Sequence, residues 1–468
     1  MSWLDRSRTI APPGFNRWLI PPAALAVHLC IGQVYATSVY KTALVDYFGA
    51  SLTQIGVIFS IAIVMLGLSA AVMGTWVDRN GPRKAMFVSA MFWVGGFLIG
   101  AAGIFTQQLW LLYIGYGFIG GIGLGIGYIS PVSTLIKWFP DRPGLATGMA
   151  IMGFGGGALI ASPLSSALLG FFDPESGTDG WVASGDAVGK LFLTLGALYL
   201  VYMLYGAWSI RVPAADWKPA GFDPSTVETK ALVTTNHVSA ANAIKTRQFW
   251  LVWVVLFCNV TAGIGILEQA APMIQDFFRQ PDGASLVTAA VAGGFVGLLS
   301  IGNMGGRFVW SATSDLVGRK RIYMLYLGGG AALYVLLSLF GGNSTILYVS
   351  LAFVILSFYG GGFATAPAYL RDLFGTFQVG AIHGRLLTAW SAAGIAGPLI
   401  VNSFLDSQGT PGELTAEAYH PALLTMVGLL VVGFIANLLV TPVSSRYHEP
   451  QGAPSVPAGV AHQDGEGK

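Results

Sequence analysis

The sequence contains very few charged residues for its length. Of its 468 residues only 10% are Asp, Glu, Lys or Arg, and 54% are hydrophobic, whereas soluble domains average about 25% charged residues. With 24 basic and 22 acidic side chains, a soluble fold of this size would not cover its surface. The net charge of +2 argues against a nucleic-acid partner, which requires a concentrated basic stripe. The composition therefore indicates a membrane protein.

Motifs for metal, nucleotide or covalent chemistry are also missing. The two cysteines, Cys30 and Cys258, fall in separate apolar runs and predict neither a disulfide nor a metal site. The glycine-rich segment 120–127 resembles a nucleotide-binding loop only superficially, because no strand precedes it and no P-loop lysine follows. Small residues at this spacing are instead typical of closely packed membrane helices. We expect no enzyme activity, no cofactor and no metal.

Long uncharged stretches locate the membrane spans. A spanning helix needs about 20 apolar residues, and two of the stretches, 85–136 and 322–370, are long enough for two spans and a turn. The first apolar run is too long for a removable signal peptide and lacks a cleavage site. We predict an all-α membrane protein of twelve transmembrane helices. They cover residues 18–43, 53–76, 85–105, 109–137, 144–171, 189–210, 248–277, 285–313, 321–340, 345–370, 380–405 and 420–442.

Basic residues predict the orientation of the chain. Cytoplasmic loops of membrane proteins carry an excess of lysine and arginine. With both termini in the cytoplasm, all of the 24 basic residues fall on that side except Lys41, Lys190 and Arg279, which fall outside, and Arg307, which lies within a span. We therefore predict a multi-pass protein with two cytoplasmic termini.

A polar, proline-containing segment divides the chain into two parts of six predicted helices each. We predict an N-terminal half over residues 1–211, a cytoplasmic linker over 212–247 and a C-terminal half over 248–446. Residues 447–468 are rich in Pro, Gly and Ala and have no periodicity, so we expect a disordered cytoplasmic tail. Nothing in the sequence demands an oligomer, and we expect a monomer.

The two halves form a parallel repeat. The loop over residues 74–84, which contains Asp78, recurs in degenerate form over 311–320 with Asp315. These loops follow the second and eighth predicted helices, half a chain apart. Two halves related by an axis along the membrane normal place a substrate site near the midplane between them.

Charged residues and glycines of these loops are candidates for a gate. A carboxylate beside several cations can cap a helix or pair across helices, and glycine permits the tight turn. The candidate gating residues are Asp78, Arg79, Gly81, Arg83, Asp315, Gly318 and Arg319. We favour a latch that holds one conformational state, and the alternative is that the loops only set the topology.

The loop sequence Gly-x-x-x-Asp-Arg-x-Gly-x-Arg-Lys at 74–84, its copy and the layout of six plus six helices resemble the major facilitator superfamily. A narrower resemblance is to its oxalate/formate antiporter family and to monocarboxylate transporters. The residues that carry it are Asn16-Arg17-Trp18, Tyr35, Tyr40, Lys137-Trp-Phe-Pro-Asp-Arg-Pro-Gly-Leu-Ala146, Gln248-Phe249-Trp250 and Gly306-Arg307. The resemblance implies a secondary active transporter of small organic anions in a bacterial inner (plasma) membrane.

Arg307 is the leading candidate for substrate binding. It lies eight residues before Asp315, or about 12 Å along a helix, near the middle of a hydrocarbon core about 30 Å thick. An arginine at that depth costs about 2.5 kcal/mol or more and signals a function, and its planar fork suits a carboxylate. In the resembled family the matched arginine is taken to bind the substrate carboxylate. A salt bridge to Glu268 is the structural alternative.

One position departs from the oxalate-transporting members of that family, which carry a lysine on the eleventh spanning helix as a second cation. In this chain the position falls on Trp390. A dianion beside one central cation would be poorly compensated. We therefore expect a monocarboxylate such as formate, lactate or pyruvate rather than oxalate. Arg385 replaces the lysine only if the eleventh helix, predicted over residues 380–405, begins later than predicted.

The resemblance places Tyr35, Tyr128, Tyr359 and Phe363 around the site, and Gln33 is a further polar candidate. The alternative for each aromatic residue is ordinary packing or contact with lipid.

Glu268 and His28 are the remaining ionisable residues inside predicted spans. Either is a candidate for proton coupling, since histidine titrates near neutrality. The alternatives are a static partner for Arg307 and a hydrogen-bonded core histidine. Coupling by proton symport and coupling by exchange for another carboxylate both remain open.

Three other functions remain as alternatives: a superfamily transporter of oxalate or a neutral solute, an anion channel, and a receptor on a transporter scaffold. A channel does not need two latch loops or a parallel repeat, and a receptor needs a larger output domain than residues 212–247 provide. We expect a small carboxylate, protons and the lipid bilayer as partners, and no nucleic acid.

Overall fold

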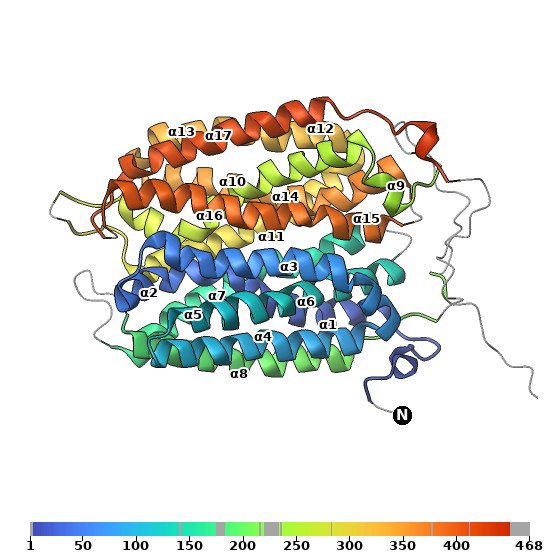
Figure 1. Ribbon diagram of the computed structural model, residues 1–468, viewed down its shortest axis with the longest axis horizontal. Coiled ribbons are helices and arrows are strands. Elements are labelled where there is room, and N and C mark those ends of the chain that lie inside the picture. The colour runs from blue at the N-terminus through green and yellow to red at the C-terminus, as the bar shows by residue number, and fades with distance from the viewer. Residues whose placement is uncertain are drawn as a thin grey trace, which may run out of the picture.

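The computed structural model describes residues 3–139, 143–174, 183–214, 217–219, 234, 236–281, 283–375, 378–410 and 412–449. Within these residues, twelve helical segments are long and apolar enough to cross a membrane, and Figure 1 shows them running side by side. In the same residues, β structure is limited to two isolated bridges. The predicted all-α class and the predicted number of spans are confirmed.

The N-terminal half supplies the first six spans. The first combines α1 (Ile20–Ile31), η3 (Gly32–Tyr40) and α2 (Lys41–Phe48), and the fourth combines α5 (Leu109–Leu112), η4 (Tyr113–Ile119) and α6 (Gly120–Trp138). The others are α3 (Leu52–Asn80), α4 (Pro82–Phe105), α7 (Pro143–Phe172) and α8 (Gly185–Ser209).

The C-terminal half supplies the other six and begins with the short helix α9 (Ala240–Ala243). Its uninterrupted spans are α10 (Arg247–Phe277), α11 (Ala289–Val317), α14 (Thr345–Phe374) and α17 (Ala416–Leu438). The ninth span combines α12 (Arg319–Met324), η6 (Leu325–Gly329) and α13 (Gly330–Phe340), and the eleventh combines α15 (Val379–Leu386) and α16 (Thr388–Gln408).

Local capping explains where several spans begin. Ser51 accepts a hydrogen bond from the Gln54 backbone, and the Gln54 side chain accepts one from the Ser51 backbone, which is a capping box. The hydroxyls of Thr246 and Thr288 accept hydrogen bonds from the third residue that follows each of them, at the starts of α10 and α11. Each cap satisfies a backbone N–H that has no partner within its own helix.

The repeated loops adopt the same tight turn in both halves. Gly81 and Gly318 have φ angles of 85° and 97°, a region that side-chain-bearing residues rarely adopt. Each donates its N–H to the carbonyl four residues earlier, and the next helix begins at the following residue. The turns predicted from the two glycines are confirmed.

The two halves meet along α7 with α11 and along α3 with α16. Figure 1 shows the blue-to-green N-terminal half on one side of this boundary and the C-terminal half, from yellow-green α10 to red α17, on the other. Glycine permits the close approach: a Cβ on Gly155 of α7 would lie 2.7 Å from the Arg307 side chain, and one on Gly56 of α3 would lie 2.3 Å from Asn402. Arg307 therefore lies at the boundary between the halves.

The first span corrects one prediction. It continues past residue 43 and ends only at Gly49, whose φ of 58° closes α2. Lys41, which was predicted near the outer end of this helix, lies within the longer span and is only 3% exposed. The predicted end at residue 43 was too early, because the chain stays helical up to Phe48.

Candidate functional site

Arg307 is completely buried on α11 at the boundary between the halves. Its Nε donates to Asn303 Oδ1 at 3.0 Å, one turn earlier, and its Nη1 donates to the Ile151 carbonyl of α7 at 3.2 Å. Its Nη2 is buried without a hydrogen-bond partner among the described residues. The guanidinium is thus fixed at two nitrogens and has one nitrogen available for an anion.

Aromatic rings from both halves surround this guanidinium. The rings of Phe154 and Phe363 lie 5.8 and 5.1 Å from its central carbon, within the range of cation–π attraction. Trp390 packs against both, at 5.4 and 4.4 Å between ring centroids. The predicted residues Phe363 and Trp390 are therefore brought together with Arg307. Phe154, within a glycine-rich stretch of α7, was not predicted.

The three predicted tyrosines belong to the same cluster. Tyr35 of η3 and Tyr359 of α14 join their hydroxyls at 2.6 Å across the boundary. Tyr128 of α6 lies 5.5 Å from Phe154 and 5.4 Å from Trp390. We call Arg307, Phe154, Phe363, Trp390 and the three tyrosines the Arg307 cluster.

Hydrogen-bond donors in the Arg307 cluster outnumber their acceptors. Besides Arg307 Nη2, the Tyr128 hydroxyl and Trp390 Nε1 are buried without hydrogen-bond partners among the described residues. Buried polar groups normally have partners, and an unpaired one costs about 1–3 kcal/mol. These three donors, one of which belongs to the cation itself, suit the two oxygens of a carboxylate. Arg385, the alternative second cation, is exposed on α15.

His28 is buried on α1 behind this cluster. Its ring is stacked on that of Tyr128 at 5.7 Å, and its two nitrogens face the carbonyls of Ala150 and Tyr128. The histidine is therefore hydrogen-bonded, and it also contacts a residue of the Arg307 cluster.

Gln33 lies in a different network. Its amide donates to the Tyr40 hydroxyl at 3.0 Å and accepts from the Tyr116 hydroxyl at 2.9 Å. Both partners belong to the N-terminal half, so the structure connects Gln33 to that half rather than to Arg307.

Glu268 pairs with Lys41 rather than with Arg307. The Lys41 ammonium donates to Glu268 Oε1 and, at 2.9 Å, to Asn402 Oδ1. Gln269 also donates to that Asn402 oxygen, at 2.5 Å. We call Lys41, Glu268, Gln269 and Asn402 the Lys41 cluster. It joins α2 of the N-terminal half to α10 and α16 of the C-terminal half.

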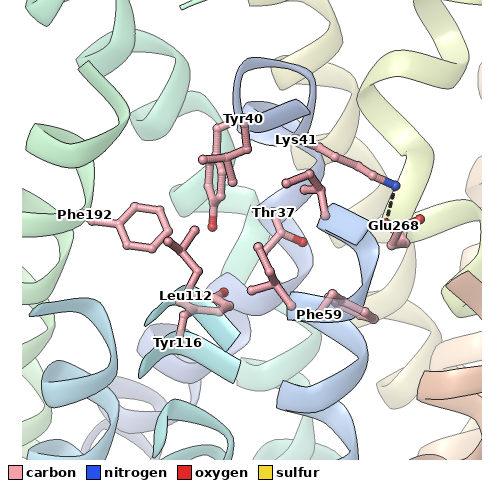
Figure 2. Close-up of a pocket in the computed structure, with 11 residues that line it drawn as sticks. Thr37, Tyr40, Lys41, Phe59, Leu112, Tyr116, Phe192 and Glu268 are labelled. Carbon is pink, nitrogen blue, oxygen red and sulfur yellow. Dashed lines mark hydrogen bonds and ion pairs between the residues drawn. The ribbon is translucent and has the colours of Figure 1, made fainter. Parts of the chain in front are cut away.

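A small cavity of about 20 Å³ adjoins this ion pair (Figure 2). Thr37, Tyr40 and Tyr116 line it together with both charged residues, and the volume is enough for a water molecule. Glu268 Oε2 is buried without a hydrogen-bond partner among the described residues. The cavity thus connects the Gln33 network to the Lys41 cluster.

The C-terminal gating candidates Asp315 and Arg319 belong to a small ion network, which we call the Arg319 network. Arg319 pairs with Asp315 one turn earlier, donates to Ser314 and approaches Asp372 Oδ2 at 3.4 Å. Asp372, near the end of α14, was not predicted. The sequence offered one signal for this residue, its position three residues before Gly375, the glycine that follows the tenth span.

The N-terminal gating candidates are arranged differently. Arg83 is buried, packs over the Trp3 ring and donates to the carbonyls of Trp3 and Trp208 at 3.2 and 3.5 Å. Arg79 is exposed, and the side chain of Asp78 lies outside the described residues. Arg83 therefore ties the chain before the first span and the end of α8 to the start of α4.

Two relatives of known name align with most of this chain, and a third aligns with less than half of it. It is 26% identical to the oxalate:formate antiporter of Oxalobacter formigenes over 82% of its own length and 83% of the relative. It is also 26% identical to apicoplast pyruvate carrier 1 of Toxoplasma gondii, over 70% of this chain and 66% of the carrier. Human monocarboxylate transporter 11 is 28% identical over 42% of this chain and 40% of its own.

A solved structure shares the fold. The inward-facing, occupied crystal structure of a bacterial homologue of the human lysosomal transporter Spinster aligns with a TM-score of 0.64 at 16% identity. The alignment covers 93% of this chain and 98% of that one. The family model of the major facilitator superfamily matches residues 23–398. This membrane protein of twelve spans belongs to the major facilitator superfamily of transporters.

Proposed function

We propose that the protein is a secondary active transporter that moves a small monocarboxylate, such as formate, lactate or pyruvate, by alternating access. The observation that carries this proposal is Arg307 Nη2, a buried cationic donor without a described partner in an aromatic cluster built from both halves. Two of the relatives are named for formate, oxalate or pyruvate, which supports a carboxylate substrate.

Charge favours a monocarboxylate over oxalate. Where a dicarboxylate would need a second cation, this cluster has the neutral indole of Trp390, 4.4 Å from Phe363. The other buried cation at the boundary, Lys41, is already compensated by Glu268. One available positive charge matches one carboxylate, since an uncompensated charge in a low-dielectric site is costly.

Rocking of the two halves supplies the transport step. The Arg307 cluster takes residues from α6, α7 and η3 on one side and from α11, α14 and α16 on the other. Separation of the halves at one end exposes a bound anion to that side of the membrane. We assign the Arg319 network to the gate at the end of the bundle that carries the termini, and we assign that end to the cytoplasm of a plasma membrane on the strength of its basic loops.

The test is uptake of labelled formate, lactate, pyruvate and oxalate into proteoliposomes by the wild type, Arg307→Ala and the matched control Arg385→Ala, which removes an exposed arginine. We expect uptake of at least one monocarboxylate that falls more than 100-fold in Arg307→Ala and is unchanged in Arg385→Ala.

Two driving conditions separate the modes of coupling: an inward proton gradient, and unlabelled substrate loaded inside the vesicle. Strong oxalate uptake would contradict the charge argument. The absence of Arg307-dependent uptake of any acid would overturn the carboxylate function and favour a neutral solute.

A further inference from the structure

His28 lies in a buried niche whose polar groups are hydrogen-bond acceptors. One ring nitrogen contacts the Ala150 carbonyl of α7, and the other lies 3.1 Å from the Tyr128 carbonyl of α6. A neutral imidazole has one N–H and one lone-pair nitrogen, whereas an imidazolium has two N–H donors. A neutral ring would satisfy one carbonyl and turn a lone pair towards the other. The charged ring satisfies both.

The sequence of α6 adds a third acceptor. Pro131 lies inside this helix, four residues after Gly127, and proline has no N–H to donate to that carbonyl. The Gly127 carbonyl therefore lacks its helical partner, one residue before the Tyr128 carbonyl that His28 contacts. The niche is complementary to a cation rather than to a neutral ring.

The niche adjoins the proposed substrate site directly. Ala150 and Ile151 are successive residues of α7, and their carbonyls accept from His28 and Arg307 respectively. The imidazole also stacks on Tyr128, whose hydroxyl belongs to the Arg307 cluster. An imidazolium and the guanidinium would thus place two positive charges on neighbouring backbone groups.

The groups that act on His28 come from the helices around it. Arg307 of α11 is the charged side chain, and Tyr128 of α6 is the titratable one. Tyr199 of α8, a helix that also packs against α1, is a further buried titratable residue on that side. Glu268, the other intramembrane candidate, is held by Lys41.

We infer that His28 takes up one proton when a carboxylate occupies the Arg307 cluster, so that the protein carries a monocarboxylate together with a proton. This inference rests on the proposed function. The niche supplies the hydrogen bonds for the imidazolium, and the bound carboxylate supplies the negative charge that offsets a second cation beside Arg307. The linkage is reciprocal: a proton on His28 raises carboxylate affinity by the same factor as the carboxylate raises proton affinity.

The first test is the affinity for lactate or formate in proteoliposome counterflow, with equal pH on both sides, between pH 6 and pH 8. Carboxylic acids with a pKa of about 4 stay ionised throughout this range, so any change reports on the protein. We expect wild-type affinity to fall with rising pH, approaching tenfold per unit for a single linked proton. His28→Gln should bind the carboxylate with an affinity that does not depend on pH. Glu268→Gln should keep the wild-type slope of affinity against pH.

A second readout follows the proton itself through a pH-sensitive dye inside the vesicle. Wild-type influx of lactate without an imposed gradient should acidify the lumen, whereas His28→Gln should exchange lactate without acidification. Counterflow by His28→Gln shows that the variant folds, and if it does not fold, the slopes of the wild type and Glu268→Gln decide.

Arg307-dependent transport with pH-independent wild-type affinity, or a slope retained in His28→Gln, would overturn this inference alone. The absence of Arg307-dependent transport of any acid would overturn the proposed function as well.

Discussion

Trp390 lies at the centre of the aromatic contacts around Arg307 and brings a neutral N–H rather than a charge. Its ring contacts Tyr128, Phe154 and Phe363, and its Nε1 is buried without a partner among the described residues. The indole therefore fills the space of a second cationic group and adds one donor. On this view, the charge of residue 390 sets the charge of the anion that the proposed site accepts.

Replacement of this indole by an amine should change the preferred anion. We expect Trp390→Lys to gain oxalate uptake and to lose about tenfold in monocarboxylate affinity, because a second cation compensates a dianion and the lost ring opens the cluster. Trp390→Phe, which removes only the donor, should keep the preference for monocarboxylates. Competition of unlabelled oxalate against labelled lactate measures both effects, and a folded Trp390→Lys protein that ignores oxalate would contradict the argument.

At the scale of helices, the Lys41 cluster connects the first span to the seventh and eleventh. Lys41 and Glu268 are only 3% and 2% exposed, and they come from opposite halves. Loss of one partner from such a pair leaves an uncompensated buried charge, which typically costs about 3–5 kcal/mol, whereas loss of both is much less harmful. Each of the two charges therefore depends on the other in the arrangement of halves seen in this structure.

A double-mutant cycle tests that connection. We expect Lys41→Met and Glu268→Gln each to lower the thermal unfolding temperature of the purified protein markedly. The double variant should be more stable than the sum of the single effects predicts, with a coupling of about 2 kcal/mol or more. Unfolding followed by tryptophan fluorescence gives the comparison. Additive losses would show that the two residues act independently.

The spans were predictable because their signal is local, whereas the partners of the buried charges were not. Twelve apolar stretches, the turns at Gly81 and Gly318 and the burial of Arg307 all follow from neighbouring residues. The partnership of Lys41 with Glu268 joins residues 227 positions apart and leaves no periodic trace, so this pair was not predicted. Phe154 was missed for a similar reason, since only the packing of α7 against α11 turns its ring towards Arg307.

At the scale of the whole molecule, the halves are joined at the end of the bundle opposite the termini (Figure 1). There the Asp406 carboxylate at the end of α16 accepts from the backbone N–H groups of Leu52 and Thr53, at 3.0 and 3.2 Å, and so caps α3 of the other half. A carboxylate at a helix N-terminus is stabilising. Together with the Lys41 cluster, this contact closes that end of the boundary.

Alternating access requires this end to open during each transport cycle, and a covalent link should prevent it. In Thr53→Cys/Asp406→Cys, a short bifunctional thiol reagent should join the halves and reduce monocarboxylate uptake at least tenfold, and a reducible version of the reagent should allow recovery. The single variants treated alike are the controls, and the native Cys30 and Cys258 are buried, which limits their reaction. The link lies at the opposite end of α16 from Trp390, which belongs to the Arg307 cluster. It should therefore leave the proposed binding site intact. A fully cross-linked protein with undiminished uptake would show that the halves do not separate here and would require a different path for the substrate.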